Sequence, residues 1–184
     1  MATKILKESK FEYLPITQVG YWQGKLMDID SEFWVDKLYD LKKEYDNRYK
    51  SNIGGYQSTN LINDANLLDL KFFIVNSIKD LTKSENINLF EMWLNISSFG
   101  NFNLPHNHIK ENKGINYSGV LYLKTNKKSG DIRFYNPFNF NESYPYTPQI
   151  KDIVLFDSNV YHSVDVNLSK EDRMSLAFNF RIEK

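Results

Sequence analysis

The hydrophobic period of this 184-residue sequence changes at about residue 86. Before that point, two segments repeat apolar residues at intervals of three and four, which is typical of amphipathic helices. After it, short runs rich in β-branched and aromatic residues follow one another at close spacing, which is typical of a sandwich or jelly roll. The chain is therefore expected to be mainly β, with its helices confined to the first half.

The helices are predicted over about 30–45, where Asp30 or Ser31 could cap the start, and over about 64–83. Residues 11–27 indicate one or two short strands broken by a proline and two glycines, and residues 51–58 indicate a loop. Strands are predicted over 89–96, 117–123, 130–135, 152–156, 161–166 and 173–180.

We expect a single domain over 1–184. In it, residues 1–86 form an N-terminal strand and helical support. Residues 87–184 form a cupin-like jelly-roll core, a double-stranded β-helix flanked by the two helices.

Composition excludes several classes of function. The chain has no cysteine, so disulfides, zinc ribbons and thiol nucleophiles are excluded. Lys plus Arg and Asp plus Glu are balanced at 23 each, which argues against a nucleic acid partner. The sequence shows no apolar signal segment and no run near the roughly 20 apolar residues of a membrane span. We expect a soluble, cytoplasmic protein without a membrane partner.

The three histidines of the chain form a candidate metal site. On an extended strand, residues i and i+2 point to the same face, so His106 and His108 could share one cation. His162 follows on a later predicted strand, which a jelly roll could bring alongside. Imidazole suits iron, zinc, copper and nickel. A His-x-His pair by itself is also compatible with two solvated loop histidines.

Arg173 and Ser175 follow the last histidine and face the same way on a predicted strand. The arginine fork can bind a carboxylate through two hydrogen bonds, and a hydroxyl two residues on can add a third. The pair therefore indicates a seat for a dicarboxylic acid beside a metal. The alternative is a surface ion pair with Glu171 or Asp172.

Five sequence segments carry a resemblance. They are SNIGGYQS (51–58), WLNI (93–96) with NLPHNH (103–108), YSGVLYL (117–123) with SGDIRFYNP (129–137), IVLFDSNVYHSV (153–164) and RMSLAFN (173–179). In this order they resemble the iron(II)- and 2-oxoglutarate-dependent dioxygenases, over about residues 51–182. More narrowly, they are similar to a branch of 2OG-Fe(II) oxygenases found in marine bacteria and their phages.

The resemblance implies an oxidoreductase that uses Fe(II), 2-oxoglutarate and O2. The expected reaction hydroxylates a C–H bond of an unknown substrate and decarboxylates 2-oxoglutarate to succinate. His106 matches the first metal-ligating histidine of the family and His162 the distal one. Arg173, with Ser175, would hold the C5 carboxylate of 2-oxoglutarate.

Two further residues are implied to bind the co-substrate. Asn95 has a spacing before His106 that is similar to a co-substrate asparagine of the AlkB-type demethylases. Tyr122 stands where relatives often place a second hydroxyl for the co-substrate. A buried core tyrosine is the alternative for Tyr122.

The sequence departs from the family at His108, because most members have Asp or Glu at this position. A three-histidine site would be neutral instead of monoanionic, which alters iron affinity and redox potential. Alternatively, Glu111 supplies the anion and His108 contacts substrate. We favour His108 as the ligand.

Two other functions stay open on sequence alone. One is a non-catalytic β-sandwich module that binds a ligand in an aromatic groove. The other is a cupin-type three-histidine oxygenase that does not use 2-oxoglutarate. The Gly54–Gly55 loop and residues 136–146 are candidate rims of a substrate pocket. The substrate is not named by the sequence, and a homodimer is compatible with it.

Overall fold

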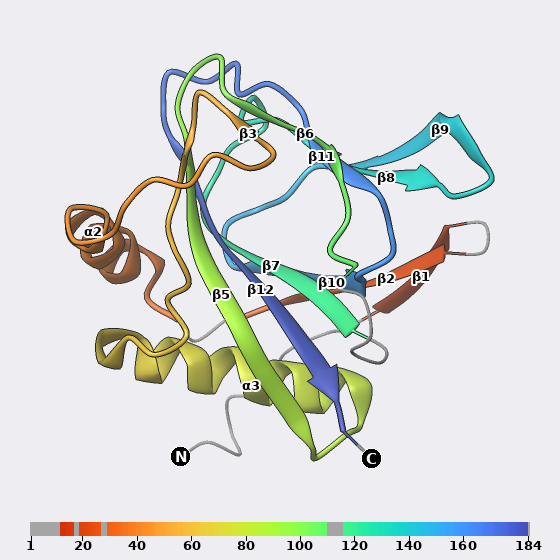
Figure 1. Ribbon diagram of the computed structural model, residues 1–184, viewed down its shortest axis with the longest axis horizontal. Coiled ribbons are helices and arrows are strands. Elements are labelled where there is room, and N and C mark those ends of the chain that lie inside the picture. The colour runs from red at the N-terminus through yellow and green to blue at the C-terminus, as the bar shows by residue number, and fades with distance from the viewer. Residues whose placement is uncertain (1–11, 17–18, 27–28, 110–115, 184) are drawn as a thin grey trace.

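Two antiparallel sheets face each other in the computed structural model, which describes residues 12–16, 19–26, 29–109 and 116–183. The larger sheet has seven strands in the order β1-β2-β10-β7-β12-β5-β4, and the smaller has five in the order β3-β6-β11-β8-β9 (Figure 1). The fold is mainly β with two α-helices in the described ranges, and it is the predicted jelly roll.

From β5 onward the strands alternate between the two sheets, except that β8 and β9 follow each other in the smaller one. Their bounds are β1 (Glu12–Ile16), β2 (Val19–Lys25), β3 (Asn52–Ile53), β4 (Tyr56–Gln57), β5 (Ile87–Ser97), β6 (Phe102–His106), β7 (Asn116–Lys124), β8 (Ile132–Asn136), β9 (Asn139–Tyr146), β10 (Asp152–Asp157), β11 (His162–Val164) and β12 (Arg173–Ile182).

The first helix, α2 (Ser31–Leu41), begins where the sequence predicts. The Asp30 carboxylate accepts a hydrogen bond from the backbone N–H of Phe33 at 3.0 Å and so caps the helix. The helix buries Trp34, Leu38 and Leu41, and it ends four residues before the predicted Tyr45.

The second helix, α3 (Leu68–Thr82), follows a short 3-10 turn, η1 (Ala65–Leu67). It ends at Lys83, whose φ of 55° is left-handed and stops helical hydrogen bonding. Together η1 and α3 cover the predicted 64–83 segment.

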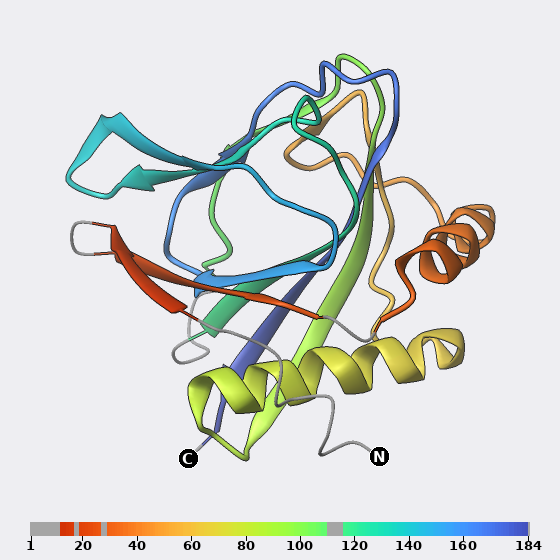
Figure 2. The ribbon, with the colours of Figure 1, turned by 180° about the vertical axis from the view of Figure 1, so that it is seen from behind.

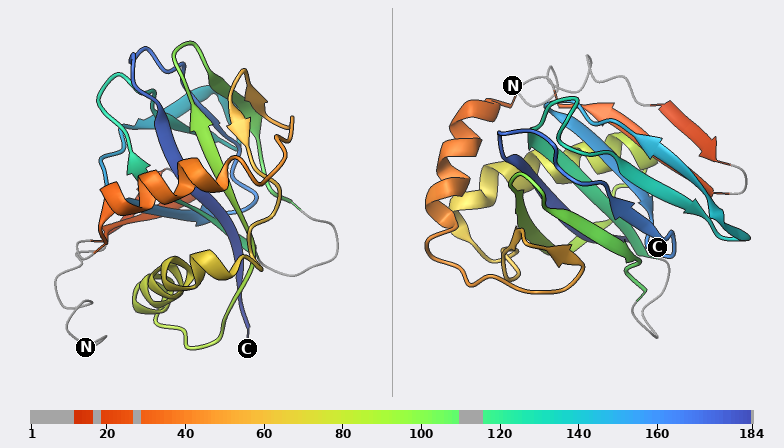
Figure 3. Two further views of the ribbon diagram at one scale, coloured as in Figure 1. Left: turned by 90° about the vertical axis from the view of Figure 1, so that its left-hand side faces the viewer. Right: turned by 90° about the horizontal axis from the view of Figure 1, so that it is seen from above.

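Both helices cover the outer face of the seven-stranded sheet (Figures 1 and 2). Their apolar sides pack with alternate residues of β5, β7, β10 and β12 into the larger hydrophobic core. A smaller core of seven buried residues lies between the sheets, and it includes Tyr122, Phe134 and Phe156. In the right view of Figure 3, from above, the strands lie in front of α3. The helical layer thus leaves the inner faces of the sheets available for a site.

Several sequence predictions need correction. The 51–58 segment is not only a loop, because it contains β3 and β4. Strand β2 runs through Gly20 and Gly24, which were expected to break it. Strands β6 and β9 were not predicted, since β6 contains a proline and β9 is largely polar and exposed.

The first 86 residues supply strands to both sheets. Strand β2 pairs with β10, β3 with β6, and β4 with β5. The expected division into a support and a core therefore does not coincide with the sheets, and the single domain over 1–184 stays a prediction. Within the described ranges, neither helix has the length and apolar character needed to cross a membrane.

Candidate metal centre

Strand pairing brings two histidines that are far apart in the sequence side by side. His162 opens β11 and His106 ends β6, and the two are direct partners in the antiparallel register. Their ring centroids lie 4.3 Å apart. His162 is buried, with 4% of its surface exposed. The predicted convergence of the distal histidine is therefore present in the fold.

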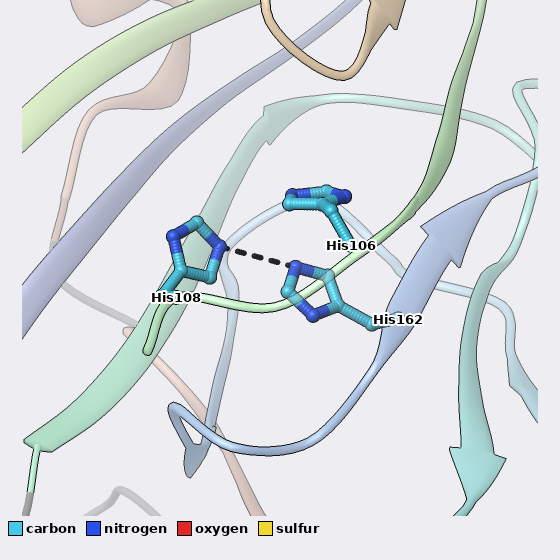
Figure 4. A group of neighbouring side chains, drawn as sticks. All are labelled: His106, His108 and His162. Atoms are coloured by element: carbon cyan, nitrogen blue, oxygen red, sulfur yellow. Dashed lines mark hydrogen bonds between the residues drawn. The ribbon is translucent and has the colours of Figure 1, made fainter. Parts of the chain in front are cut away.

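His108 reaches the same point from outside the strand. It lies two residues beyond the end of β6, so the argument from strand alternation does not apply to it. Its backbone N–H donates to the carbonyl of Ser158 at 2.9 Å, and its ring lies 5.5 Å from that of Trp93. The His108 Nε2 atom is 3.3 Å from Nε2 of His162, as drawn in Figure 4.

The hydrogen bonds of two rings favour metal binding. Nδ1 of His106 lies 2.8 Å from the carbonyl of Leu104, and Nδ1 of His162 lies 3.0 Å from the carbonyl of Val160. A carbonyl accepts and never donates, so each Nδ1 must carry the proton. Each Nε2 then presents a lone pair, which is the tautomer that a metal-ligating histidine needs.

The spacing of the ligand atoms fits one cation. One ring nitrogen from each of the three histidines lies within 4.8 Å of the others. Two neighbouring ligands about 2.1 Å from one metal are roughly 3 Å apart, close to the Nε2–Nε2 contact of His108 and His162. The three side chains therefore fit a metal ion.

Burial keeps the imidazoles neutral. It lowers the pKa of His106, and the nearby charge of Lys50 lowers it further. Burial also lowers the pKa of His162 well below its usual value, and His106 and His108 add to the effect. A neutral imidazole is the form that binds metal.

The carboxylate alternative cannot be located in the fold. Glu111 lies outside the described residues. Within the described ranges, the cluster that could hold a metal consists of the three histidines with no carboxylate.

Arg173 is a buried cation next to this centre, with 3% of its surface exposed. Its Nη1 donates to the carbonyl of Ser129 at 3.1 Å and its Nη2 to Oγ of Ser97 at 3.2 Å. Among the described residues no carboxylate lies within ion-pair distance of it. Burial lowers the pKa of Arg173 because the charged form loses its hydration. An anion bound here would compensate that charge.

The alternative of a surface ion pair for Arg173 is wrong. The Asp172 carboxylate instead accepts hydrogen bonds from the hydroxyls of Tyr39 at 2.8 Å and Ser98 at 2.7 Å. Glu171 lies near the amide of Asn126, at 3.4 Å. Both acids are engaged away from the guanidinium.

The three histidines and Arg173 line one cavity. Its space of about 540 Å³ opens in part to solvent. Asn95, Tyr122 and Ser175 line it too, and they lie side by side, since Ser175 of β12 is the register partner of Asn95 on β5 and Tyr122 on β7. All the sequence-predicted site residues are thus brought together.

Tyr122 is compatible with both interpretations made from the sequence, a core tyrosine and a hydroxyl that contacts the co-substrate. It is 2% exposed and belongs to the inner core, yet it also lines the cavity. Burial raises its pKa, so its hydroxyl keeps its proton and could donate to an anion.

Other residues of the site were not predicted. Ser97 and Ser129 hold the guanidinium, and generic serines give no sequence signal for such a role. Gln57 also lines the cavity, and its buried Oε1 has no hydrogen-bond partner among the described residues. The sequence held one indication for Gln57, which is its position in the 51–58 segment that carries the family resemblance. The Gly54–Gly55 loop and residues 136–146 are not among the residues that line the cavity.

The central and C-terminal strands match a known family. Residues 91–179, from within β5 to within β12, match the model of the family described as "Putative 2OG-Fe(II) oxygenase". The match spans just under half of the chain. The match contains all three histidines, Arg173 and the other predicted site residues. A comparison with curated protein sequences finds no match.

Solved structures of low sequence identity share the fold of this chain. The alpha ketoglutarate dependent epimerase SnoN from nogalamycin biosynthesis has a TM-score of 0.70 at 13% identity, over 89% of this chain and 78% of that one. HygX from Streptomyces hygroscopicus, with nickel, 2-oxoglutarate and hygromycin B bound, has a TM-score of 0.66 at 11% identity, covering 88% and 82%. A prolyl-4-hydroxylase from Pseudomonas putida has a TM-score of 0.65 at 16% identity, with full coverage of both chains.

The family match and the cluster of three histidines support one class of chemistry. The protein is an oxidoreductase of the 2-oxoglutarate-dependent dioxygenase class, and its cofactors are Fe(II), 2-oxoglutarate and O2. These predictions from the sequence are confirmed. The roles of individual site residues, the marine branch and the substrate stay predictions.

Proposed function

We propose that His106, His108 and His162 hold Fe(II), that Arg173 and Ser175 hold the C5 carboxylate of 2-oxoglutarate, and that the protein hydroxylates a C–H bond of its substrate. One observation carries the proposal. A buried guanidinium without a carboxylate partner among the described residues lines the same cavity as three convergent imidazoles. A cation and a metal in one cavity match the two ends of a 2-oxo dicarboxylate.

The side chains of the cavity have separate tasks. Arg173 neutralises the distal carboxylate. Hydrogen bonds to Ser97 and Ser129 already hold its guanidinium in place, so the side chain loses little freedom when the co-substrate binds. The Ser175 hydroxyl can add a hydrogen bond to the same carboxylate. When bound, iron and 2-oxoglutarate together supply an oxidant made from O2, with release of succinate and carbon dioxide.

Asn95 and Tyr122 complete the seat for the co-substrate in this proposal. Both stand beside Ser175 on adjacent strands of a rigid sheet, so their polar groups are oriented before binding. The apolar side chains of Ile132 and Phe156 line the same cavity and keep water away from it.

Anaerobic titration with Fe(II), with and without 2-oxoglutarate, tests the proposal. We expect a weak visible charge-transfer band that needs both components. Arg173→Ala should abolish the band and the slow decarboxylation of 2-oxoglutarate that occurs without substrate. A missing band at saturating iron and co-substrate would contradict the proposal. Decarboxylation that is indifferent to Arg173→Ala would support the cupin-type alternative instead.

The identity of the third ligand needs a paired comparison. His108→Ala should lower Fe(II) affinity by more than roughly tenfold, since a first ligand is worth at least as much as its supporting partners. Glu111→Ala should leave Fe(II) affinity within about twofold. The reverse pattern, measured by the same titration, would show that Glu111 supplies the anion and that His108 has another role.

A further inference from the structure

A second cleft adjoins the first cavity at two of the metal-centre histidines. It shares Ser51, Gln57, Trp93, His106 and His108 with the first cavity, and it adds Arg48 and Lys50. Its space of about 1070 Å³ is larger than that of the first cavity and also open to solvent. A molecule in this cleft would therefore lie against the metal centre.

The charges of the cleft are arranged unevenly. Arg48 and Lys50 come from one short segment, while the acidic lining residue among the described ranges is Glu91 of β5. The Glu91 carboxylate accepts a hydrogen bond from the amide of Asn179 at 2.9 Å, so it is already engaged. The segment of Arg48 and Lys50 is thus the part of the cleft that would attract an anion.

The basic segment is held in position by the backbone. The N–H of Arg48 donates to the carbonyl of Gln57 at 2.7 Å, and the N–H of Gln57 donates to Oδ1 of Asn47 at 2.9 Å. The N–H of Lys50 donates to Oδ1 of Asn52 at 3.0 Å. Arg48 and Gln57 therefore stand next to each other on paired segments, and both side chains border the cleft.

Gln57 supplies an independent observation. Its side chain is 7% exposed, and its Oε1 is buried without a hydrogen-bond partner among the described residues. Leaving a buried acceptor without a donor destabilises the folded state. The 2-oxoglutarate dianion has acceptors but no donor, so it cannot satisfy this oxygen. A second ligand with an N–H or O–H group could supply the donor.

We infer that the substrate is an anionic small molecule, whose carboxylate or phosphate group binds the Arg48–Lys50 segment and whose N–H or O–H group donates to Oε1 of Gln57. This inference rests on the proposed function, because it places the substrate against the three histidines. The Trp93 ring also lines the cleft and offers a flat apolar surface for the rest of the molecule.

Line broadening by a paramagnetic metal tests the inference without relying on turnover. Mn(II), the divalent ion directly below Fe(II) in the affinity order of first-row metals, is added to the full-length protein with saturating 2-oxoglutarate. Matched acid and amide probes are then added at millimolar concentration. The pairs are 4-hydroxybenzoate with 4-hydroxybenzamide and N-acetyl-L-phenylalanine with N-acetyl-L-phenylalaninamide. A phosphate arm compares 4-hydroxyphenyl phosphate with hydroquinone.

We expect the anionic member of a pair to broaden roughly fivefold or more beyond the neutral one, as a partly exposed ion pair allows. The carboxylate and phosphate arms then show which anion is preferred. The difference should vanish in the double variant Arg48→Ala/Lys50→Ala and persist in Lys79→Ala, which removes an exposed cation of α3 elsewhere. Gln57→Leu should weaken the anionic and neutral members of a pair alike.

Equal broadening of both members, broadening of neither, or a difference that survives in the double variant overturns the inference. Failure of the proposed function has a different signature. In that case the 2-oxoglutarate-dependent band with Fe(II) is missing before any probe is added.

Discussion

Both faces of β12 are buried, but one packs into the hydrophobic core and the other lines the cavity. Met174, Leu176 and Phe178 point outward into the core that the helices cover. Arg173 and Ser175 point inward and line the cavity. All five are at most 5% exposed, so burial alone does not distinguish the faces. The difference lies in what each buried group gains from the folded state.

The outer face stabilises the fold, and the inner face costs stability. Burying a large apolar side chain contributes about 1.5–3 kcal/mol. A buried guanidinium without a carboxylate partner loses hydration that three neutral hydrogen bonds do not fully replace. Because side chains alternate between the two faces of β12, one face contributes to stability and the other to function. Four variants test this division.

His162→Ala should have the largest effect on function. It removes a buried ligand, and we expect Fe(II) affinity to fall by more than roughly a hundredfold. Ser163→Ala is the matched control, because Ser163 is adjacent on β11 but hydrogen-bonds Tyr135 instead. Its Fe(II) affinity should stay within about twofold in a calorimetric titration. Equal affinities in the two variants would remove His162 from the site.

Phe178→Ala should have the largest effect on stability. Phe178 is fully buried, and truncation of such a ring costs about 3–5 kcal/mol of the free energy of unfolding. Urea unfolding measures this loss. Because the ring faces the helices, the Fe(II) and 2-oxoglutarate affinities of the folded fraction should stay within about threefold. A large loss of affinity at low urea would mean that the two faces are coupled.

Arg173→Met should have the opposite effect to Phe178→Ala, with a loss of ligand affinity and no loss of stability. Replacing the buried cation by an apolar side chain of similar length should leave the free energy of unfolding unchanged or raise it by about 1 kcal/mol. The affinity for 2-oxoglutarate should fall roughly 30-fold or more, since its carboxylate loses a buried charged partner. A clear loss of stability without ligands would contradict the view that the inner face costs stability.

The alternation behind this comparison could be predicted from the sequence. The run Arg173–Phe180 has the composition of a strand, and α2 and α3 follow from their apolar spacing and the Asp30 cap. The candidate ligands were also found, because histidine is rare in this chain. These features could be predicted because they depend on residues that are close together in the sequence.

What could not be predicted depends on contacts between distant segments. β6 contains Pro105 and no clear alternation, and it is a strand because β3 and β11 pair with it from both sides. The 51–58 segment bends at Gly54, whose φ of 74° suits glycine, so β3 joins the small sheet and β4 the large one. The placement of Gln57 beside the histidines follows from that bend.

Tyr39→Phe should have the smallest effect, because it changes a contact at the junction of the outer layer and β12. The Tyr39 hydroxyl on α2 donates to the carboxylate of Asp172, the residue before Arg173, at 2.8 Å. Losing this partly exposed hydrogen bond should cost about 0.5–1.5 kcal/mol of unfolding free energy and leave 2-oxoglutarate affinity within about twofold.

The pH dependence of that loss identifies its cause. Burial, with the hydrogen bond and charge of Asp172, raises the pKa of Tyr39 from 10.0 to about 12. The unfolded chain releases this proton first, so the contribution of Tyr39 to stability is complete below the unfolded pKa and is lost as the pH rises toward the folded one. The difference between wild type and Tyr39→Phe in urea unfolding should therefore narrow above pH 10. A constant difference across that range would mean that packing of the ring, and not the hydroxyl, joins α2 to the strand that carries Arg173.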